Sequence, residues 1–131
     1  MRVFIADDSV AFGTLASAWL EAQPDIEVVG AVRSAEEAIA QVVDARPDVV
    51  ILDRLLPQPE NSERVAAHIR ATLPGTAILL VSGMPNEDLA DEARETGADG
   101  HVSKAANAAA LADAVRTVAA RRASGQSPQT D

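Results

Sequence analysis

Short apolar runs alternate with segments of helical periodicity five times along this chain, and this alternation restricts the possible folds more than any other feature of the sequence. The apolar runs cover residues 2–6, 26–32, 48–53, 77–81 and 100–103. Within 48–53 and 77–81 the apolar residues are consecutive, which is typical of strands buried on both faces of a parallel sheet. Strands that alternate with helices form right-handed crossovers. We therefore expect an α/β fold in which helices cover both faces of a five-stranded parallel sheet.

The segments between the apolar runs have the spacing of amphipathic helices. We expect helices over residues 9–22, 34–45, 62–73, 86–96 and 108–122. Their predicted apolar stripes are Phe12, Leu15 and Trp19; Ile39, Val42 and Val43; and Leu111, Val115 and Val118. Ser34, with Glu37 three residues later, has the pattern of a capping box, and Gly97 stands where a left-handed helix cap is common. Residues 54–61 are expected to form a loop.

The length of 131 residues suits one domain with one core. We expect that domain over residues 1–122, and a flexible tail or truncated linker over residues 123–131, which lack apolar periodicity. The net charge of −9 argues against direct binding to nucleic acid or to an anionic membrane, because both need clustered cations. The chain has no cysteine, no apolar run long enough to cross a bilayer and no signal-peptide pattern, so a cytoplasmic protein is expected.

Polar residues that can take part in chemistry stand where four of the predicted strands end. They are Asp7 and Asp8 after the first strand, Asp53 at the end of the third, Ser82 after the fourth and Lys104 after the fifth. Ligands of open parallel sheets bind beyond these carboxyl ends. Neighbouring carboxylates repel one another, and Mg²⁺, which prefers oxygen ligands, relieves that repulsion. A carboxylate can attack phosphorus, and Mg²⁺, a hydroxyl and an ammonium can then neutralise the phosphoryl group.

Lys104 is the only lysine in a chain that otherwise uses arginine. A phosphoryl site accounts for it, because a slim ammonium and a broad guanidinium fork suit different sites. Simpler interpretations exist for single residues. Asp8 and Ser9 are suited to cap a helix, Asp53 and Arg54 to form a surface ion pair, and Lys104 to be a solvated side chain. The joint placement at four strand ends is what favours one common site.

Four segments, FIADDS, VVILDRLLP, LLVSG and GADGHVSKA, resemble the signatures of the response-regulator receiver domain of two-component signalling. The resemblance covers about residues 1–122 and implies a flavodoxin-like (βα)5 three-layer sandwich with a parallel sheet of order 2-1-3-4-5. It also implies that Asp53 is the phosphoacceptor, that Mg²⁺ is the cofactor, and that Ser82 and Lys104 contact the phosphoryl group. The implied Mg²⁺ ligands are Asp7, Asp8, Asp53 and the backbone carbonyl of Leu55.

Longer segments, DIEVVGAVRSAEEAI, RPDVVILD and LADAVRTVAA, resemble the receivers of NarL/LuxR-type transcription regulators. This resemblance implies that a sensor histidine kinase donates the phosphoryl group, and that the face formed by residues 86–96, 100–103 and 108–122 switches the binding of a partner. Homodimerisation on phosphorylation is compatible with the apolar and small residues of the last two helices. Such a domain catalyses only its own phosphorylation and dephosphorylation. It takes part in transcription regulation, and reaches DNA, only through an attached output domain.

Three positions depart from the pattern of that family. Leu56 precedes Pro57 where Met is common, and Asn61 stands where Gly is common, so the turn into the third helix is expected to differ. His101 stands where most receivers carry Tyr or Phe, whose ring swings inward on activation. An imidazole can make the same swing and can also titrate near neutral pH, which predicts a pH-sensitive switch. A surface histidine at a tolerant position is the simpler alternative.

Two other functions stay open. A small Mg²⁺-dependent phosphatase of the haloacid-dehalogenase type also uses a strand-end aspartate and a lysine. Its nucleophile belongs to an Asp-x-Asp pattern after the first strand, whereas Asp7 and Asp8 are adjacent here. The other is a phosphorylation-independent pseudo-receiver that acts as an interaction module. Asn61 and His101 keep that function open, although all five site residues are present.

Overall fold

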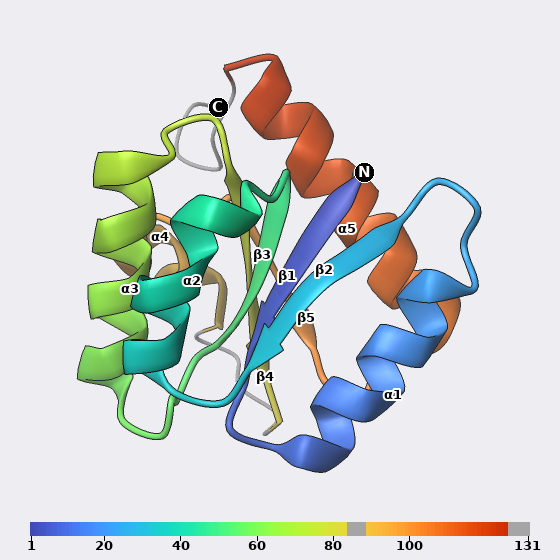
Figure 1. The fold of residues 1–131 in the computed structure, drawn as a ribbon, viewed down its shortest axis with the longest axis horizontal. Helices are drawn as coiled ribbons and strands as arrows, with labels where there is room; N and C mark the ends of the chain where they lie inside the picture. The colour runs from blue at the N-terminus through green and yellow to red at the C-terminus, as the bar shows by residue number, and fades with distance from the viewer. Residues whose placement is uncertain (84–88, 126–131) are drawn as a thin grey trace.

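The computed structural model describes residues 1–83 and 89–125. Within these residues, strands and helices alternate along the whole chain (Figure 1). The strands are β1 (Arg2–Ala6), β2 (Glu27–Val32), β3 (Val49–Asp53), β4 (Ala77–Ser82) and β5 (Gly100–Ser103). The helices are α1 (Val10–Glu21), α2 (Ala35–Ala45), α3 (Pro59–Thr72), α4 (Leu89–Thr96) and α5 (Ala108–Ala123). Neighbouring strands pair in parallel in the order β2-β1-β3-β4-β5, so the predicted flavodoxin-like topology is confirmed.

The sheet separates two hydrophobic cores. Helices α2, α3 and α4 cover one face and α1 and α5 cover the other (Figure 1). Along β3, Val50 and Leu52 belong to the first core, whereas Val49 and Ile51 belong to the second. This alternation follows from the two-residue period of a strand. It explains why the run is apolar at consecutive positions, because both faces of the central strand are covered.

The predicted apolar stripes are only partly correct. The stripe of α5, formed by Leu111, Val115 and Val118, is buried as predicted. In the other two helices, however, Leu15 is 46% exposed and Val43 is 37% exposed. The residues that α1 and α2 bury are Ala16, Leu20, Ala35, Ala38 and Val42, of which only Val42 was in a predicted stripe. The prediction was wrong at Leu15 and Val43 because it followed large side chains, whereas these helices approach the sheet largely through alanines.

The start of α3 also differs from the prediction. The helix begins at Pro59 rather than at residue 62, and proline at the first helical positions is favourable because it lacks only an N–H that has no partner there. Asn61 therefore lies in the first turn of the helix, and its Nδ2 donates to the carbonyl oxygen of Leu56 at 2.9 Å. Asn61 is not among the residues with positive φ, so this position does not require glycine.

Helix ends elsewhere follow the sequence signals. The Ser34 hydroxyl accepts from the N–H of Glu37, so the predicted N-cap is confirmed. The Glu37 carboxylate reaches back to the Ser34 hydroxyl and to the N–H of Arg33, one residue before the N-cap position that a standard capping box uses. Gly97 has the expected left-handed φ of +80° after α4. Helix α5 continues to Ala123. Residues 126–131 of the predicted tail lie outside the described residues, and the domain boundary at residue 122 stays a prediction. No helix among the described residues is long and apolar enough to cross a membrane.

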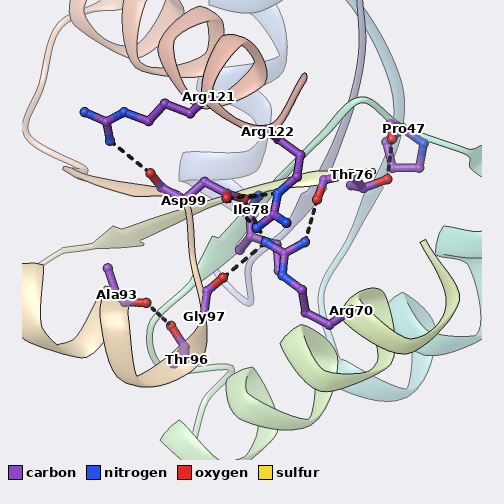
Figure 2. A network of polar contacts seen from close by, with 10 residues as sticks. All are labelled: Pro47, Arg70, Thr76, Ile78, Ala93, Thr96, Gly97, Asp99, Arg121 and Arg122. Carbon is purple, nitrogen blue, oxygen red and sulfur yellow. Dashed lines mark hydrogen bonds and ion pairs between the residues drawn. The ribbon is translucent and has the colours of Figure 1, made fainter. Parts of the chain in front are cut away.

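A buried carboxylate connects α3, α5 and the sheet at the amino ends of β4 and β5 (Figure 2). Asp99 is fully buried. Its Oδ2 accepts from Nη2 of Arg70 in α3 at 2.7 Å and from the N–H of Ile78 in β4 at 2.8 Å. Its Oδ1 accepts from Nη2 of Arg122 in α5 at 2.6 Å. Because α3 and α5 cover opposite faces, this carboxylate ties the three layers together at one edge of the sheet.

Candidate functional site

The carboxyl ends of four strands bring the predicted site residues to one edge of the sheet. Asp7 follows β1, Asp53 ends β3, Ser82 ends β4, and Lys104 follows β5. The backbone fixes their relative positions, because Asp53 is paired with Val81 and the N–H of Lys104 donates to the carbonyl oxygen of Ser82 at 2.8 Å. The side chains of Asp7, Asp53 and Ser82 are buried. The convergence expected from strand ends is therefore present.

Three carboxylates form the centre of this site. Asp7, Asp8 and Asp53 each place one carboxylate oxygen within 4.8 Å of the other two. Asp8 is exposed, whereas the other two are buried. Oxygen ligands at such separations suit a hard divalent cation, which usually takes one or two carboxylates together with other oxygens.

The single lysine lies between the two buried carboxylates. Its Nζ is 2.6 Å from Oδ2 of Asp7 and 3.2 Å from Oδ2 of Asp53. Burial by itself lowers the pKa of Lys104, but the close contact with the Asp7 carboxylate and the negative charges of both aspartates outweigh it and raise that pKa above 10.5. Lys104 therefore stays a cation at neutral pH, and the interpretation as a freely solvated side chain is wrong.

One ammonium does not neutralise this group of acids. Burial and the negative charge of Asp7 raise the pKa of Asp53 from 3.8 to about 7, against the opposing effect of Lys104. In addition, Oδ2 of Asp7 is buried and accepts no well-formed hydrogen bond, although it is the oxygen closest to the ammonium. The site thus has negative charge to offer to a further cation.

Backbone and hydroxyl groups hold the two buried aspartates in place. The N–H of Leu55 donates to Oδ1 of Asp53 at 3.2 Å, and the Ser62 hydroxyl of α3 donates to the carbonyl oxygen of Asp53 at 2.5 Å. The N–H of Ser9 donates to Oδ1 of Asp7 at 2.8 Å. Ser62 was missed in the sequence, where it was assigned only as the first residue of a helix. Its hydrogen bond to Asp53, nine positions earlier, corresponds to no short-range sequence pattern.

Two alternatives considered for single residues are now settled. Ser9 is indeed the N-cap of α1, since its hydroxyl accepts from the N–H of Phe12 at 3.2 Å, but Asp8 is not that cap. Arg54 does not pair with Asp53. Its Nη1 donates to both carboxylate oxygens of Glu92 in α4, at 2.8 and 3.0 Å. The residue after Asp53 therefore connects this site to α4.

His101 lies outside the acidic cluster. It is an exposed residue of β5, paired with Leu80 of β4, and it lines a surface pocket together with Thr117 and Arg121 of α5. The role of His101 in a switch stays a prediction. Residues 86–88, the first three of the helix predicted over residues 86–96, lie outside the described residues.

Comparisons with known proteins point to one family. Residues 3–116 match the response regulator receiver domain. The oxygen regulatory protein NreC of Staphylococcus epidermidis is 35% identical over 118 residues, which are 90% of this chain and 54% of NreC. This chain thus spans about half the length of the curated relatives that it matches.

Solved structures agree with this match. A LuxR-family two-component response regulator from an Aurantimonas species is 28% identical with a TM-score of 0.82, over 96% of this chain and 86% of that one. The signal receiver domain of NarL from Mycobacterium tuberculosis is 28% identical with a TM-score of 0.79, over 91% of this chain and 95% of that one. The similarity therefore covers the sheet, its helices and the edge that carries the aspartates.

Proposed function

This chain belongs to the response regulator receiver domain family, and we propose that it works as a phosphorylation switch in which Asp53 accepts a phosphoryl group from a sensor histidine kinase. The observation that carries the proposal is the convergence of three carboxylates, Ser82 and Lys104 at one edge of the sheet. A site of this composition can neutralise a phosphoryl group on a carboxylate. Membership in this family leaves the phosphatase interpretation without support.

Mg²⁺ fits the residues present. All the available donors are oxygens, the negative charge exceeds that of Lys104, and Oδ2 of Asp7 lacks a well-formed hydrogen bond. Asp7, Asp8, Asp53 and the backbone carbonyl of Leu55 would hold the ion. When bound, it supplies positive charge that lowers the repulsion between the carboxylates and an incoming phosphoryl group.

The protein residues then have distinct roles. An oxygen of Asp53 forms the new bond to phosphorus while the bond from phosphorus to the imidazole nitrogen of the kinase phosphohistidine breaks. The Ser82 hydroxyl donates to one phosphoryl oxygen and the Lys104 ammonium pairs with another. Leu55 and Ser62 keep the backbone and the carboxylate of Asp53 in position during this step.

The output of the switch is a change in partner binding. The α4–β5–α5 face is the proposed binding surface, and the ion pair from Arg54 to Glu92 of α4 gives it a direct connection to the residue beside Asp53. The phosphoryl group shifts the equilibrium only by as much as its contacts differ between the two states. We propose that phosphorylation strengthens homodimerisation or another contact at this face.

Transcription regulation through an attached output domain is the proposed setting, since NreC is a regulatory protein about twice as long as the matched region. A net charge of −9 does not favour contact with DNA by this domain itself. The kinase would meet the domain in the cytoplasm. A phosphorylation-independent interaction module remains the competing function.

Incubation with acetyl phosphate and Mg²⁺ tests the proposal. We expect an intact mass higher by one phosphoryl group, located on Asp53 by fragmentation, because the carboxylate needs no kinase when the donor is reactive. Chelation of Mg²⁺ should suppress the gain, since the acidic site then repels the donor. No gain of mass by a folded protein in the presence of Mg²⁺ contradicts the proposal and favours the phosphorylation-independent module.

Replacing His101 by Phe tests its part in the switch. Imidazole ordinarily changes its charge near neutral pH, so wild type and His101→Phe should differ in their response to pH between about pH 6 and about pH 8. The measurement is dimerisation or partner binding after saturating phosphorylation at each pH. Parallel responses of the two proteins would show that His101 does not take part in the switch.

A further inference from the structure

An aromatic ring lies against the single lysine of the site. Nζ of Lys104 is 5.0 Å from the centroid of the Phe12 ring in α1. The chain has only two phenylalanines, one tryptophan and no tyrosine, so this contact uses one of very few aromatic side chains. Phe12 was predicted only as part of an apolar stripe, and its ring is indeed partly buried against the core. The contact between the Phe12 ring and the Lys104 ammonium was not predicted.

A series of contacts leads from Asp7 through Ser9, Phe12 and Lys104 and back to Asp7. The N–H of Ser9 donates to Oδ1 of Asp7 at 2.8 Å, and the Ser9 hydroxyl accepts from the N–H of Phe12 at 3.2 Å. The Phe12 ring lies 5.0 Å from Nζ of Lys104, which is 2.6 Å from Oδ2 of Asp7. The first turn of α1 therefore fixes the ring and the carboxylate relative to each other, on two sides of the same ammonium.

We propose that Phe12 is a positioning residue that holds the Lys104 ammonium at the two buried aspartates through a cation–π contact. This inference rests on the proposed roles of Asp53 and Lys104 in phosphorylation. A cation within about 6 Å of a ring centroid is attracted by the ring, more strongly when it is partly desolvated. The Lys104 side chain is only 16% exposed, so this condition is met.

The ring acts by limiting where a flexible side chain can place its charge. Lysine has a four-carbon stem with many rotamers. A Cβ at Gly83 would lie 3.6 Å from Cδ of Lys104, so the stem also passes close to the backbone after β4. The ring and the two carboxylates then leave the ammonium one favoured place. Without the ring, the Lys104 ammonium occupies a wider range of positions. It then spends less time where it can pair with a phosphoryl oxygen.

The first arm of the test observes the geometry directly. Because the chain has one lysine, isotope-labelled lysine gives one side-chain spin system in an NMR spectrum. We expect the ε-methylene protons of Lys104 to be shifted upfield by the ring current of Phe12. Phe12→Leu should lose this shift and Phe12→Tyr should keep it. Trp19→Leu is the matched control, because Trp19 is also a partly buried aromatic residue of α1 packed on the same core.

The second arm measures the rate of phosphorylation by acetyl phosphate at saturating Mg²⁺, on variants whose fold is checked by circular dichroism. Phe12→Leu should slow it about fivefold, which corresponds to a cation–π contribution of about 1 kcal/mol. Phe12→Tyr and Trp19→Leu should stay within about twofold of wild type. An unchanged rate in Phe12→Leu, or an equal loss in Trp19→Leu, overturns the proposal.

The two arms separate this inference from the function on which it rests. If wild type takes up no phosphoryl group, the proposed function fails, and the NMR arm still decides whether Phe12 positions the ammonium. Retention of the upfield shift in Phe12→Leu overturns the positioning role whatever the rates are. Loss of the shift together with the slower reaction in Phe12→Leu, and in neither Phe12→Tyr nor Trp19→Leu, supports it.

Discussion

Asp53→Asn should take up no phosphoryl group from acetyl phosphate and, at the same time, should be more stable than wild type above neutral pH. The loss of uptake follows because the amide oxygen is a far weaker nucleophile than a carboxylate. The gain in stability follows because burial and the neighbouring Asp7 make the charge of Asp53 unfavourable in the folded state and raise its pKa to about 7. Function and stability are thus expected to oppose each other at this residue.

The sign of the pH dependence follows from the two pKa values. In the unfolded chain the carboxyl group ionises near 3.8, whereas in the folded protein it ionises at about 7. Between these values the folded state binds more protons than the unfolded state, so wild type loses stability as pH rises through this window. A difference of one in pKa corresponds to about 1.4 kcal/mol. The advantage of Asp53→Asn should therefore grow from near zero at low pH to a few kcal/mol above neutral pH.

Urea unfolding followed by the fluorescence of Trp19, with a chelator present, measures this difference at a series of pH values. Asp113→Asn is the control, because Asp113 has a side chain that is 78% exposed and its replacement should change the free energy of unfolding by less than about 0.5 kcal/mol at any pH. A constant difference between Asp53→Asn and wild type across the pH series would contradict the assignment of a raised pKa. Mg²⁺ should reduce the difference by stabilising the ionised form of Asp53.

Asp99→Ala should lower the free energy of unfolding by about 3–5 kcal/mol, the usual cost of removing one partner from a buried ion pair. Both Arg70 and Arg122 would lose the carboxylate that balances their charges, and the N–H of Ile78 would lose its acceptor inside the sheet. Burial already lowers the pKa of Arg70, with Asp99 as the main opposing influence, so its charge is costly at this place without the aspartate.

Asp25→Ala gives a matched comparison for this prediction. Asp25 also binds an arginine, Arg116, but the two side chains are 50% and 36% exposed. Surface pairs of this kind contribute little to stability, because water and salt screen their charges. Urea unfolding of both variants should therefore give a loss for Asp99→Ala several times that for Asp25→Ala. Similar losses would mean that burial of Asp99 does not determine its contribution.

Much of this structure was accessible from the sequence, for a physical reason. Parallel strands place their carboxyl ends at one edge, so residues at the strand ends had to meet wherever the strands were correctly located. Asp7, Asp53, Ser82 and Lys104 were found in this way. The helix cap formed by Ser34 and Glu37 was found because the two residues are three positions apart and interact within one turn.

Other features depend on contacts that leave no local pattern. Asp99 binds arginines that are 29 and 23 residues away, and Arg54 binds Glu92, which is 38 residues away. No periodicity connects such positions, and only the packed fold decides which charges meet. The burial of Ala16 in place of Leu15 is similar, because the distance between a helix and the sheet decides how large a side chain fits between them.

The Asp99 network and the proposed phosphorylation site lie at opposite ends of the same strands, and this separation affects how such a domain can diversify. The carboxyl edge carries charges that disfavour folding, whereas the amino edge carries a network that fastens the layers together. Loops at the carboxyl edge can therefore change in sequence without disturbing the Asp99 network. A family built on this plan can acquire new kinases and new partners by substitutions at one end while the other end keeps the fold intact.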